Sequence, residues 1–577
     1  MSIKGSVRSS QLVTTYGVGA MIAAGNESFI VAGIDRWNRD EDFEFHEPRL
    51  ERMLHVQAFM RPPSTGESDS WDVPVRRFPL YHSCPTCHRL NDISYFESPF
   101  GQCVCSLCDD QPDLVPSRFV TACGDGHLDD FPYYVWVHRD HPHDDSTGKS
   151  KLYLKTLGEG AGLRDVIIEC SCGAKESMDG AFGKKALRGI KGCAGKRPWL
   201  AKAEGESCDK HLVTIQRGAS NVWFSETISA ISIPPWSDRA FKVLDRHWKV
   251  LKAVPAVALE PTIEALGIAD DEHSVADLLA VAAHRKAQET DDVDIEDVKS
   301  EEYEALMRGA AERPGHQFVC VPAAEPGDLA KEWVPVVNQV TRLREVRVLR
   351  GFSRLLPPKG GAEDDGHEGT GNVVRLPGPE HGWLPAIEVM GEGVFLEFTS
   401  ERLAAWEQRS NVRKRVARLA ERYAAAGGWG ESLEVSPRFV LLHSLSHALI
   451  DQWALESGYS AAALTERLYV APDRAGVLIY TATSDSAGSL GGVVAMTDDG
   501  RLDSSLVEAI KRASWCSADP LCIETATQGA DALNLAACHA CSLLPETSCE
   551  HRNQLLDRAL LVGTPEDPTL GFFADLI

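Results

Sequence analysis

The sequence has no apolar run that approaches the roughly 18 residues of a membrane-spanning helix, and it is poor in positive charge. Its 59 Lys and Arg residues stand against 84 Asp and Glu residues, for a formal net charge of −25. A surface of this charge repels nucleic acids and anionic membranes, so any contact with DNA needs a local basic patch. We therefore expect a cytoplasmic protein that does not contact a membrane.

The sequence also lacks a Walker motif. The stretch Tyr16-Gly17-Val18-Gly19-Ala20 is rich in glycine, but it has neither the third glycine nor the Lys-Ser/Thr pair of a phosphate-binding loop. We interpret it as a tight turn and expect no intrinsic ATPase activity.

The length of 577 residues is enough for about three or four domains. Loop-like stretches at 63–70, 289–304 and 357–382 suggest where domains end. We predict an α+β multidomain protein with an N-terminal module that contains a zinc ribbon, a helical middle, and a C-terminal mixed α/β domain with a cysteine metal site. The predicted segments are a strand-rich start (1–75), a cysteine-rich module (76–235), a mainly helical middle (236–330), a mixed region with basic helices and a disordered loop (331–430), and a C-terminal domain (431–577).

Cysteine, in contrast, is abundant. Fifteen of the 16 cysteines lie in two blocks, at 84–208 and 516–549, and only Cys320 stands alone, as expected of a buried core thiol. In a reducing compartment, clustered cysteines indicate metal binding more often than disulfides.

The strongest metal signal is a pair of CxxC motifs, Cys84-Pro-Thr-Cys87 and Cys105-Ser-Leu-Cys108. Each turn lets two thiolates face one ion, and two such turns on a hairpin complete the tetrahedral sulfur shell of structural zinc. A thioredoxin-like redox pair is the alternative, but the second CxxC at ribbon spacing argues against it. Cys103 is a spare thiol that can replace Cys105.

A second, looser set of ligands consists of Cys170, Cys172, Cys193 and Cys208. We expect a second zinc ion there. Cys123 and His127 compete as ligands, and some of these thiols can also be plain buried side chains.

Five cysteines lie near the C-terminal end: Cys516, Cys522, Cys538, Cys541 and Cys549. We favour the last four as ligands of a third zinc ion and keep Cys516 in reserve. His539 raises the alternative of a Cys-His nucleophile, but sequence neighbours do not generally face each other. As assigned, all three sites are saturated by sulfur and leave no open position for water, so we interpret their two to three Zn²⁺ ions as structural.

Two histidines in His443-Ser-Leu-Ser-His447 share one helical face. Metalloproteases of the HExxH type use this spacing, but Ser444 stands where their glutamate would be. Together with Asp485, in the glycine-rich stretch 483–492, these histidines support an alternative hypothesis of a metal-dependent nuclease or hydrolase. A core helix followed by a plain loop is the simpler interpretation.

Two arginine-rich stretches stand out in this acidic chain, TRLREVRVLRGFSR and NVRKRVARLAERY. If each is helical, basic residues spaced by three and four positions share one stripe. Such a stripe can bind phosphates or an acidic partner, or it can simply be solvated. The candidate nucleic-acid contacts are Arg347, Arg350, Arg354, Arg415 and Arg418.

The C-terminal part resembles the cysteine-bearing domain of unknown function attached to some helicases. The resemblance is carried by HSLSHALI, VLIYTATSDSAGSLGG and AACHACSLLPETSCEHRNQLLDRALL. Over its full length the chain resembles the DrmB family, the subunits that carry this domain in DISARM phage-defence systems. The further matching stretches are TYGVGAMIAAGNESFIVAGIDRW, CGDGHLDDFPYYVWVHR, QRGASNVWF, LREVRVLRGFSRL and GEGVFLEF.

This resemblance implies a non-catalytic subunit that pairs with a DrmA-like helicase in a complex that engages invading DNA. It carries the zinc role over to the cysteines assigned above, while the extra Cys103 and Cys516 leave the choice of ligands open. In the family an Asp usually follows the Tyr of the strand before the glycine turn; here Thr481 follows Tyr480, so a role for that carboxylate does not carry over. The remaining hypothesis is a structural adaptor that does not contact DNA.

Overall fold

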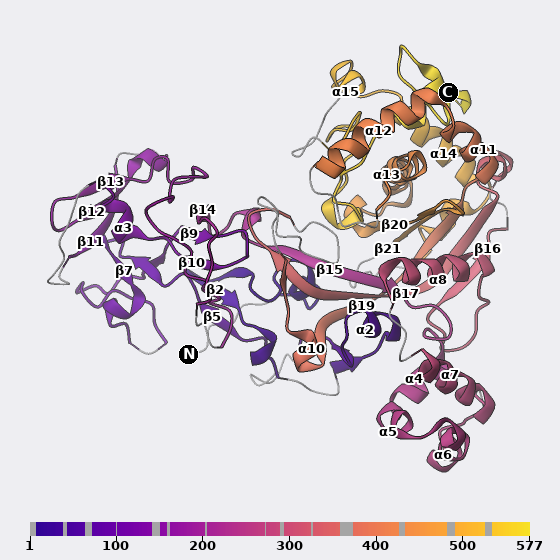
Figure 1. Cartoon of the computed structure of the whole chain (residues 1–577), viewed down its shortest axis with the longest axis horizontal. Helices are drawn as coiled ribbons and strands as arrows, with labels where there is room; N and C mark the ends of the chain where they lie inside the picture. The colour runs from indigo at the N-terminus through magenta and orange to yellow at the C-terminus, as the bar shows by residue number, and fades with distance from the viewer. Residues whose placement is uncertain are drawn as a thin grey trace. The chain divides into compact units, whose positions relative to one another are not determined.

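The computed structural model describes residues 7–38, 43–63, 72–99, 101–140, 150–157, 162–201, 205–271, 273–288, 293–324, 327–357, 373–425, 433–481, 491–525 and 533–576. The chain forms two compact units, each assembled from separate stretches of sequence: residues 1–45, 54–228 and 348–387 form the first, and residues 46–53, 229–347 and 388–577 form the second. The chain contains both strands and helices, which confirms the predicted mixed α and β class (Figure 1).

Short antiparallel strands make up most of the first unit. One sheet has the order β1 (Met21–Ala24), β2 (Glu27–Val31), β5 (Val75–Arg77), and another has the order β10 (Leu128–Asp130), β9 (Phe119–Ala122), β14 (Val213–Gln216). The largest has the order β13 (Lys175–Ser177), β12 (Val166–Cys170), β11 (Leu152–Thr156), β7 (Arg89–Asp92), β6 (Tyr81–Ser83), β8 (Val115–Pro116).

The core of this unit is aromatic. Phe131 packs edge-on against Tyr133 and Trp136 of α3 (Tyr133–Val137), with ring centroids 4.9 and 5.6 Å apart. All three side chains are buried. Cys123, Cys170, Cys193 and Cys208 pack into the same apolar cluster as these rings, whereas the two CxxC motifs pack around Phe96 and Leu114.

Three long strands contribute residues to both units: β15 (Phe224–Ile231), β17 (Val336–Ser353) and β19 (Trp383–Glu397). In the first unit, β18 (Val374–Arg375) pairs with β17, β4 (Ala58–Met60) pairs with β19, and β3 (Glu44–Phe45) pairs with β4. In the second unit, β16 (Val319–Pro322) pairs with β17, while β19 pairs with β21 (Arg474–Thr481), which pairs with β20 (Leu464–Ala471). Because each of these three strands has residues in both units, neither unit is continuous in sequence.

Helix α13 (Pro437–Ser457) lies at the centre of the second unit. The Ser436 side chain accepts a hydrogen bond from the N–H of Phe439, and Pro437 occupies the first turn, as is usual at a helix start. Apolar residues lie on all sides of α13, so it is buried all round. It packs against β20 and β21 and against the helices α11 (Ser400–Glu407), α12 (Ser410–Ala425), α14 (Arg501–Ala513) and α16 (Ala559–Val562) (Figure 1).

The remaining helices are mostly short. The predicted helical middle is present as α4 (Arg239–Asp245), α5 (Trp248–Ala253), α6 (Leu259–Leu266), α7 (Val275–Ala287), α8 (Ile295–Arg308) and α9 (Asp328–Trp333). The others are α1 (Gln11–Thr14), α2 (Pro48–Met53), α10 (Gly378–His381) and α15 (Leu521–Glu524). Within the described residues, no helix combines the length and the apolar character needed to cross a membrane.

Candidate metal centres

The first cysteine cluster is the one formed by the two CxxC motifs. Cys84 and Cys87 lie in the turn between β6 and β7, and Cys105 and Cys108 lie in the loop that leads to β8. The sulfur atoms of Cys84 and Cys108 are 3.8 Å apart, and those of Cys87 and Cys105 are 3.9 Å apart. Zinc with four sulfur ligands separates them by roughly 3.8 Å. The structure thus brings the four predicted sulfurs to the spacing of a zinc site.

Cys103 stays outside this cluster. Its thiol is buried, and burial raises its pKa to about 11.

The second cluster differs from the predicted grouping. It combines Cys193 and Cys208 with Cys123 and His127, the residues that the sequence analysis treated as competitors. Cys123 and His127 lie in the turn between β9 and β10, and Nδ1 of His127 is 3.3 Å from Sγ of Cys123 and 3.6 Å from Sγ of Cys193. The Cys-x₃-His spacing around two glycines was the signal for this site.

A carboxylate supports the histidine of this cluster. Nε2 of His127 lies 2.6 Å from Oε1 of Glu206, and Arg197 also contacts that carboxylate. Histidines that bind metal usually donate their other N–H to such a group, which fixes the tautomer and the ring orientation. The sequence analysis missed Glu206, because nothing in its neighbourhood marks it.

Cys170 and Cys172 lie elsewhere, so their assignment to the second cluster is corrected. Cys170 ends β12 and Cys172 follows in the turn to β13. They group with His138, whose Nε2 is 3.4 Å from Sγ of Cys172. β12 belongs to the six-stranded sheet, whereas the Cys193 and Cys208 segment meets the β9–β10 turn, and residue spacing alone does not reveal this separation.

The third cluster contains Cys516, Cys522, Cys538 and Cys541. The sulfur atoms of Cys516 and Cys538 are 3.5 Å apart, and those of Cys522 and Cys541 are 3.7 Å apart. The reserve residue Cys516 therefore takes the place predicted for Cys549. The turn after α14 brings Cys516 back toward Cys522, while Cys549 lies near α13.

Electrostatics within the clusters favours a cation. The hydrogen bond from Cys123 lowers the pKa of Cys193 to about 4, while the same contact raises the pKa of Cys123. Thiolates on Cys123 and Cys193 would repel each other, so without a cation only one of the two thiols ionises readily. A divalent ion removes the conflict and lets all of the thiol ligands ionise together.

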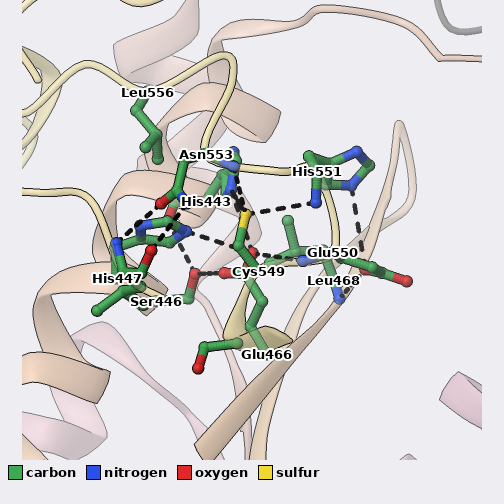
Figure 2. Close-up of polar contacts among 12 residues, drawn as sticks. His443, Ser446, His447, Glu466, Leu468, Cys549, Glu550, His551, Asn553 and Leu556 are labelled. Carbon is green, nitrogen blue, oxygen red and sulfur yellow. Dashed lines mark hydrogen bonds and ion pairs between the residues drawn. The ribbon is translucent and has the colours of Figure 1, made fainter. Parts of the chain in front are cut away.

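His443 and His447 lie side by side on α13, as their spacing predicts. Figure 2 shows them with Cys549, and their group is completed by Glu466 of β20. All four side chains are buried. Asp485, the third member of the hydrolase hypothesis, lies outside the described residues.

The first arginine-rich stretch is a strand, not a helix, so the predicted stripe of Arg347, Arg350 and Arg354 does not form. Successive side chains of β17 point to opposite faces, which puts Arg347 on the face opposite to Arg350, and Arg354 follows the end of the strand. Arg347 pairs with Glu345 and Arg350 pairs with Glu226.

Arg354 is fully buried and holds the first unit together. Its guanidinium donates hydrogen bonds to the carbonyl oxygens of Gly126, Val222 and Gly19 at 2.9, 2.6 and 2.7 Å. Burial lowers its pKa to about 9. Sequence reasoning missed this role because the three carbonyls come from distant parts of the chain.

The second arginine-rich stretch is the helix α12. Its buried face consists of Val412, Val416, Leu419 and Tyr423. Arg415 forms a bidentate pair with the buried carboxylate of Asp557, so it is not a free cation. Arg418 is exposed, together with Arg413 and Lys414.

Comparison with known proteins identifies two regions and one full-length relative. Residues 8–224 match the family described as "Domain of unknown function (DUF8724)", and residues 445–542 match the "MrfA Zn-binding domain". The chain is 32% identical over 582 residues to the "DISARM protein DrmB" of Bacillus paralicheniformis, an alignment that covers 96% of this chain and 99% of the relative. The zinc-binding match contains all four cysteines of the third cluster, which supports zinc as its ion.

Removal of single cysteines tests the corrected grouping. Cys123→Ser and Cys516→Ser should each lower the zinc content by about one ion per chain, because each removes one of four ligands. Cys103→Ser is the matched control and should leave the zinc content unchanged. Elemental analysis of the purified proteins measures all three, and an unchanged zinc content in Cys123→Ser would contradict the second cluster.

Truncation of Arg354 tests its structural role. We expect Arg354→Ala to lower the free energy of unfolding by about 3 kcal/mol or more, because three buried carbonyl oxygens lose a charged donor. Arg418→Ala, on the exposed face of α12, should change it by less than about 0.5 kcal/mol. Denaturant unfolding compares the two variants, and equal effects would show that Arg354 is no more structural than a surface cation.

Proposed function

Because the chain belongs to the DrmB family of DISARM proteins, we propose that it is a zinc-binding subunit of an anti-phage defence complex and performs no catalysis itself. In this proposal it pairs with a DrmA-like helicase and helps to hold invading DNA. The observation that carries the proposal is the presence, among the described residues, of three four-ligand clusters with at least three thiols each, whose donor atoms lie at the spacing of zinc ligands.

The composition of the clusters supports a structural role for the ions. Each cluster supplies four protein ligands, at least three of them thiols, and therefore completes a tetrahedral shell. A catalytic zinc keeps one position for water or substrate. We propose three structural Zn²⁺ ions at these clusters, which stabilise the loops around them as the platforms on which a partner docks.

The proposed DNA contact rests on α12. Its solvent-facing side carries Arg413, Lys414 and Arg418, whereas Arg347, Arg350 and Arg354 are engaged by protein groups. A local cationic patch of this kind can bind phosphates although the whole chain is acidic.

The hydrolase alternative has less support. His443 and His447 are buried, and Glu466 and Cys549 complete their surroundings, so four protein donors converge where a catalytic ion would need an open position. This geometry favours a site whose four coordination positions are all taken by protein ligands, with none left for water or substrate.

Co-purification tests the pairing. A tagged copy of this chain, produced with the DrmA-like helicase, should retain the helicase through purification. The isolated chain should hydrolyse neither ATP nor DNA in the presence of divalent metals. Metal-dependent cleavage by the isolated chain, abolished in a folded His447→Ala variant, would favour the hydrolase instead.

Salt dependence tests the DNA contact. In the complex, the double variant Lys414→Ala/Arg418→Ala should weaken DNA binding and lower the slope of log K against log salt by roughly two, because each cation neutralises one phosphate. Lys184→Ala/Lys185→Ala removes two exposed charges from the first unit and serves as the matched control. Fluorescence anisotropy at several salt concentrations measures both variants. Equal binding by the two variants would contradict the α12 contact and favour an adaptor that does not bind DNA.

A further inference from the structure

We propose that His443, His447, Glu466 and Cys549 form a fourth metal site, which holds a structural Zn²⁺ ion inside the second unit. The two imidazoles come from α13, the carboxylate from β20 and the thiol from the segment that follows the third cluster. Their donor atoms all lie within 4.8 Å of one another. Figure 2 shows how closely the rings of His443 and His447 approach Cys549.

The distances between the donor atoms fit a small tetrahedral ion. Nε2 of His443 lies 3.1 Å from Oε1 of Glu466 and 3.2 Å from Sγ of Cys549. Nε2 of His447 lies 3.5 Å from the same carboxylate oxygen. Zinc bonds of roughly 2.0–2.3 Å place tetrahedral ligands about 3.3–3.7 Å apart, close to these values.

Outer polar atoms of His447 and Glu466 have partners of their own, whereas Nδ1 of His443 is buried and forms no hydrogen bond within the described part of the chain. Nδ1 of His447 is 2.7 Å from the carbonyl oxygen of Ser542, and the hydroxyl of Ser446 donates to Oε2 of Glu466. A carbonyl oxygen only accepts, so Nδ1 of His447 carries a proton, and in the neutral ring that binds a metal Nε2 presents its lone pair to the site. Such outer contacts orient the ligands of a metal.

The sulfur of Cys549 has the surroundings of a metal thiolate. It accepts hydrogen bonds from the backbone N–H groups of His551 and Asn553 at 3.3 and 3.2 Å. The N–H two residues after Cys193 and the one two residues after Cys516 make the same contact in the other clusters, at 3.4 Å each. Cys549 therefore repeats the local geometry of cysteines that belong to four-ligand sites.

On the inner side of the site, one ligand atom lacks a hydrogen-bond partner. Nε2 of His447 is buried and forms no hydrogen bond within the described part of the chain. Its lone pair faces a carboxylate oxygen, and two electron-rich atoms at 3.5 Å repel each other unless a cation lies between them. Two neutral imidazoles, a carboxylate and a thiolate carry a charge of −2, which one divalent ion cancels.

This ion would tie α13, β20 and the segment around Cys549 into one body. The site is independent of the proposed partner and of DNA, and Cys549 and His443 lie outside residues 445–542, which match the zinc-binding domain. Mixed nitrogen, oxygen and sulfur ligands in tetrahedral array suit Zn²⁺.

Anomalous diffraction from crystals of the full chain or of its complex tests the site without any substitution. Data collected on both sides of the zinc absorption edge should give a peak between His443, His447, Glu466 and Cys549, alongside the peak in the Cys516 cluster. A peak only in the Cys516 cluster would overturn the proposal. A peak at the fourth site that persists below the edge would overturn the choice of zinc.

Two variants give a second measurement. Glu466→Gln keeps the size of the side chain, and Cys549→Ala removes one ligand; each should release about one zinc ion per chain during dialysis against a mild chelator. Cys320→Ala, which removes a buried thiol outside the clusters, is the matched control and should release none beyond the unchanged protein. Equal zinc retention in all three folded variants would contradict the site.

Discussion

Mutual repulsion between electron-rich atoms is the constraint on which this structure depends. Thiol sulfurs converge to 3.5–3.9 Å in three places, and each set would carry at least three negative charges if all of its thiols were ionised. A divalent cation bound at such a cluster neutralises part of this charge, and its binding free energy then adds to the free energy of folding. The segments that carry the cysteines are turns and loops with little regular structure, so ions bound there would supply what a larger apolar core otherwise provides.

The need to balance buried charge also determines where the arginines lie. In an acidic chain, a basic stretch suggests a surface for an anionic partner, but most of these guanidinium groups meet their counter-charge inside the protein. Arg350 meets Glu226 and Arg415 meets Asp557, while Arg354 satisfies three backbone carbonyls instead. A buried charge without such partners would be strongly destabilising, so each is matched to groups from distant parts of the chain. The exposed cations that remain on α12 form a much smaller basic surface than the sequence suggests.

Several features of the fold and the sites were predictable because they depend on neighbouring residues. The CxxC turns hold two thiolates toward one ion whatever surrounds them, and the spacing of His443 and His447 places both on one face of α13. The capped start of α13 at Ser436 and Pro437 is local as well. The stretch that forms β17 was harder to interpret, because arginines spaced by three and four residues imitate a helical stripe, while its many valines and leucines favour a strand buried in a sheet.

By itself, then, the sequence determined the mixed α and β class, the cysteine-rich character of both ends of the chain and the turns that pair adjacent ligands. Only the tertiary structure decided which turns meet. Cys170 and Cys193 are closer in sequence than Cys123 and Cys208, yet the first two belong to different groups and the last two meet in one cluster. Glu466, from the neighbouring strand β20, joins the two histidines of α13. Ligand spacing is a local property of the backbone, but the closing of a four-ligand shell depends on strand pairing and on the burial of charge, which are properties of the whole fold.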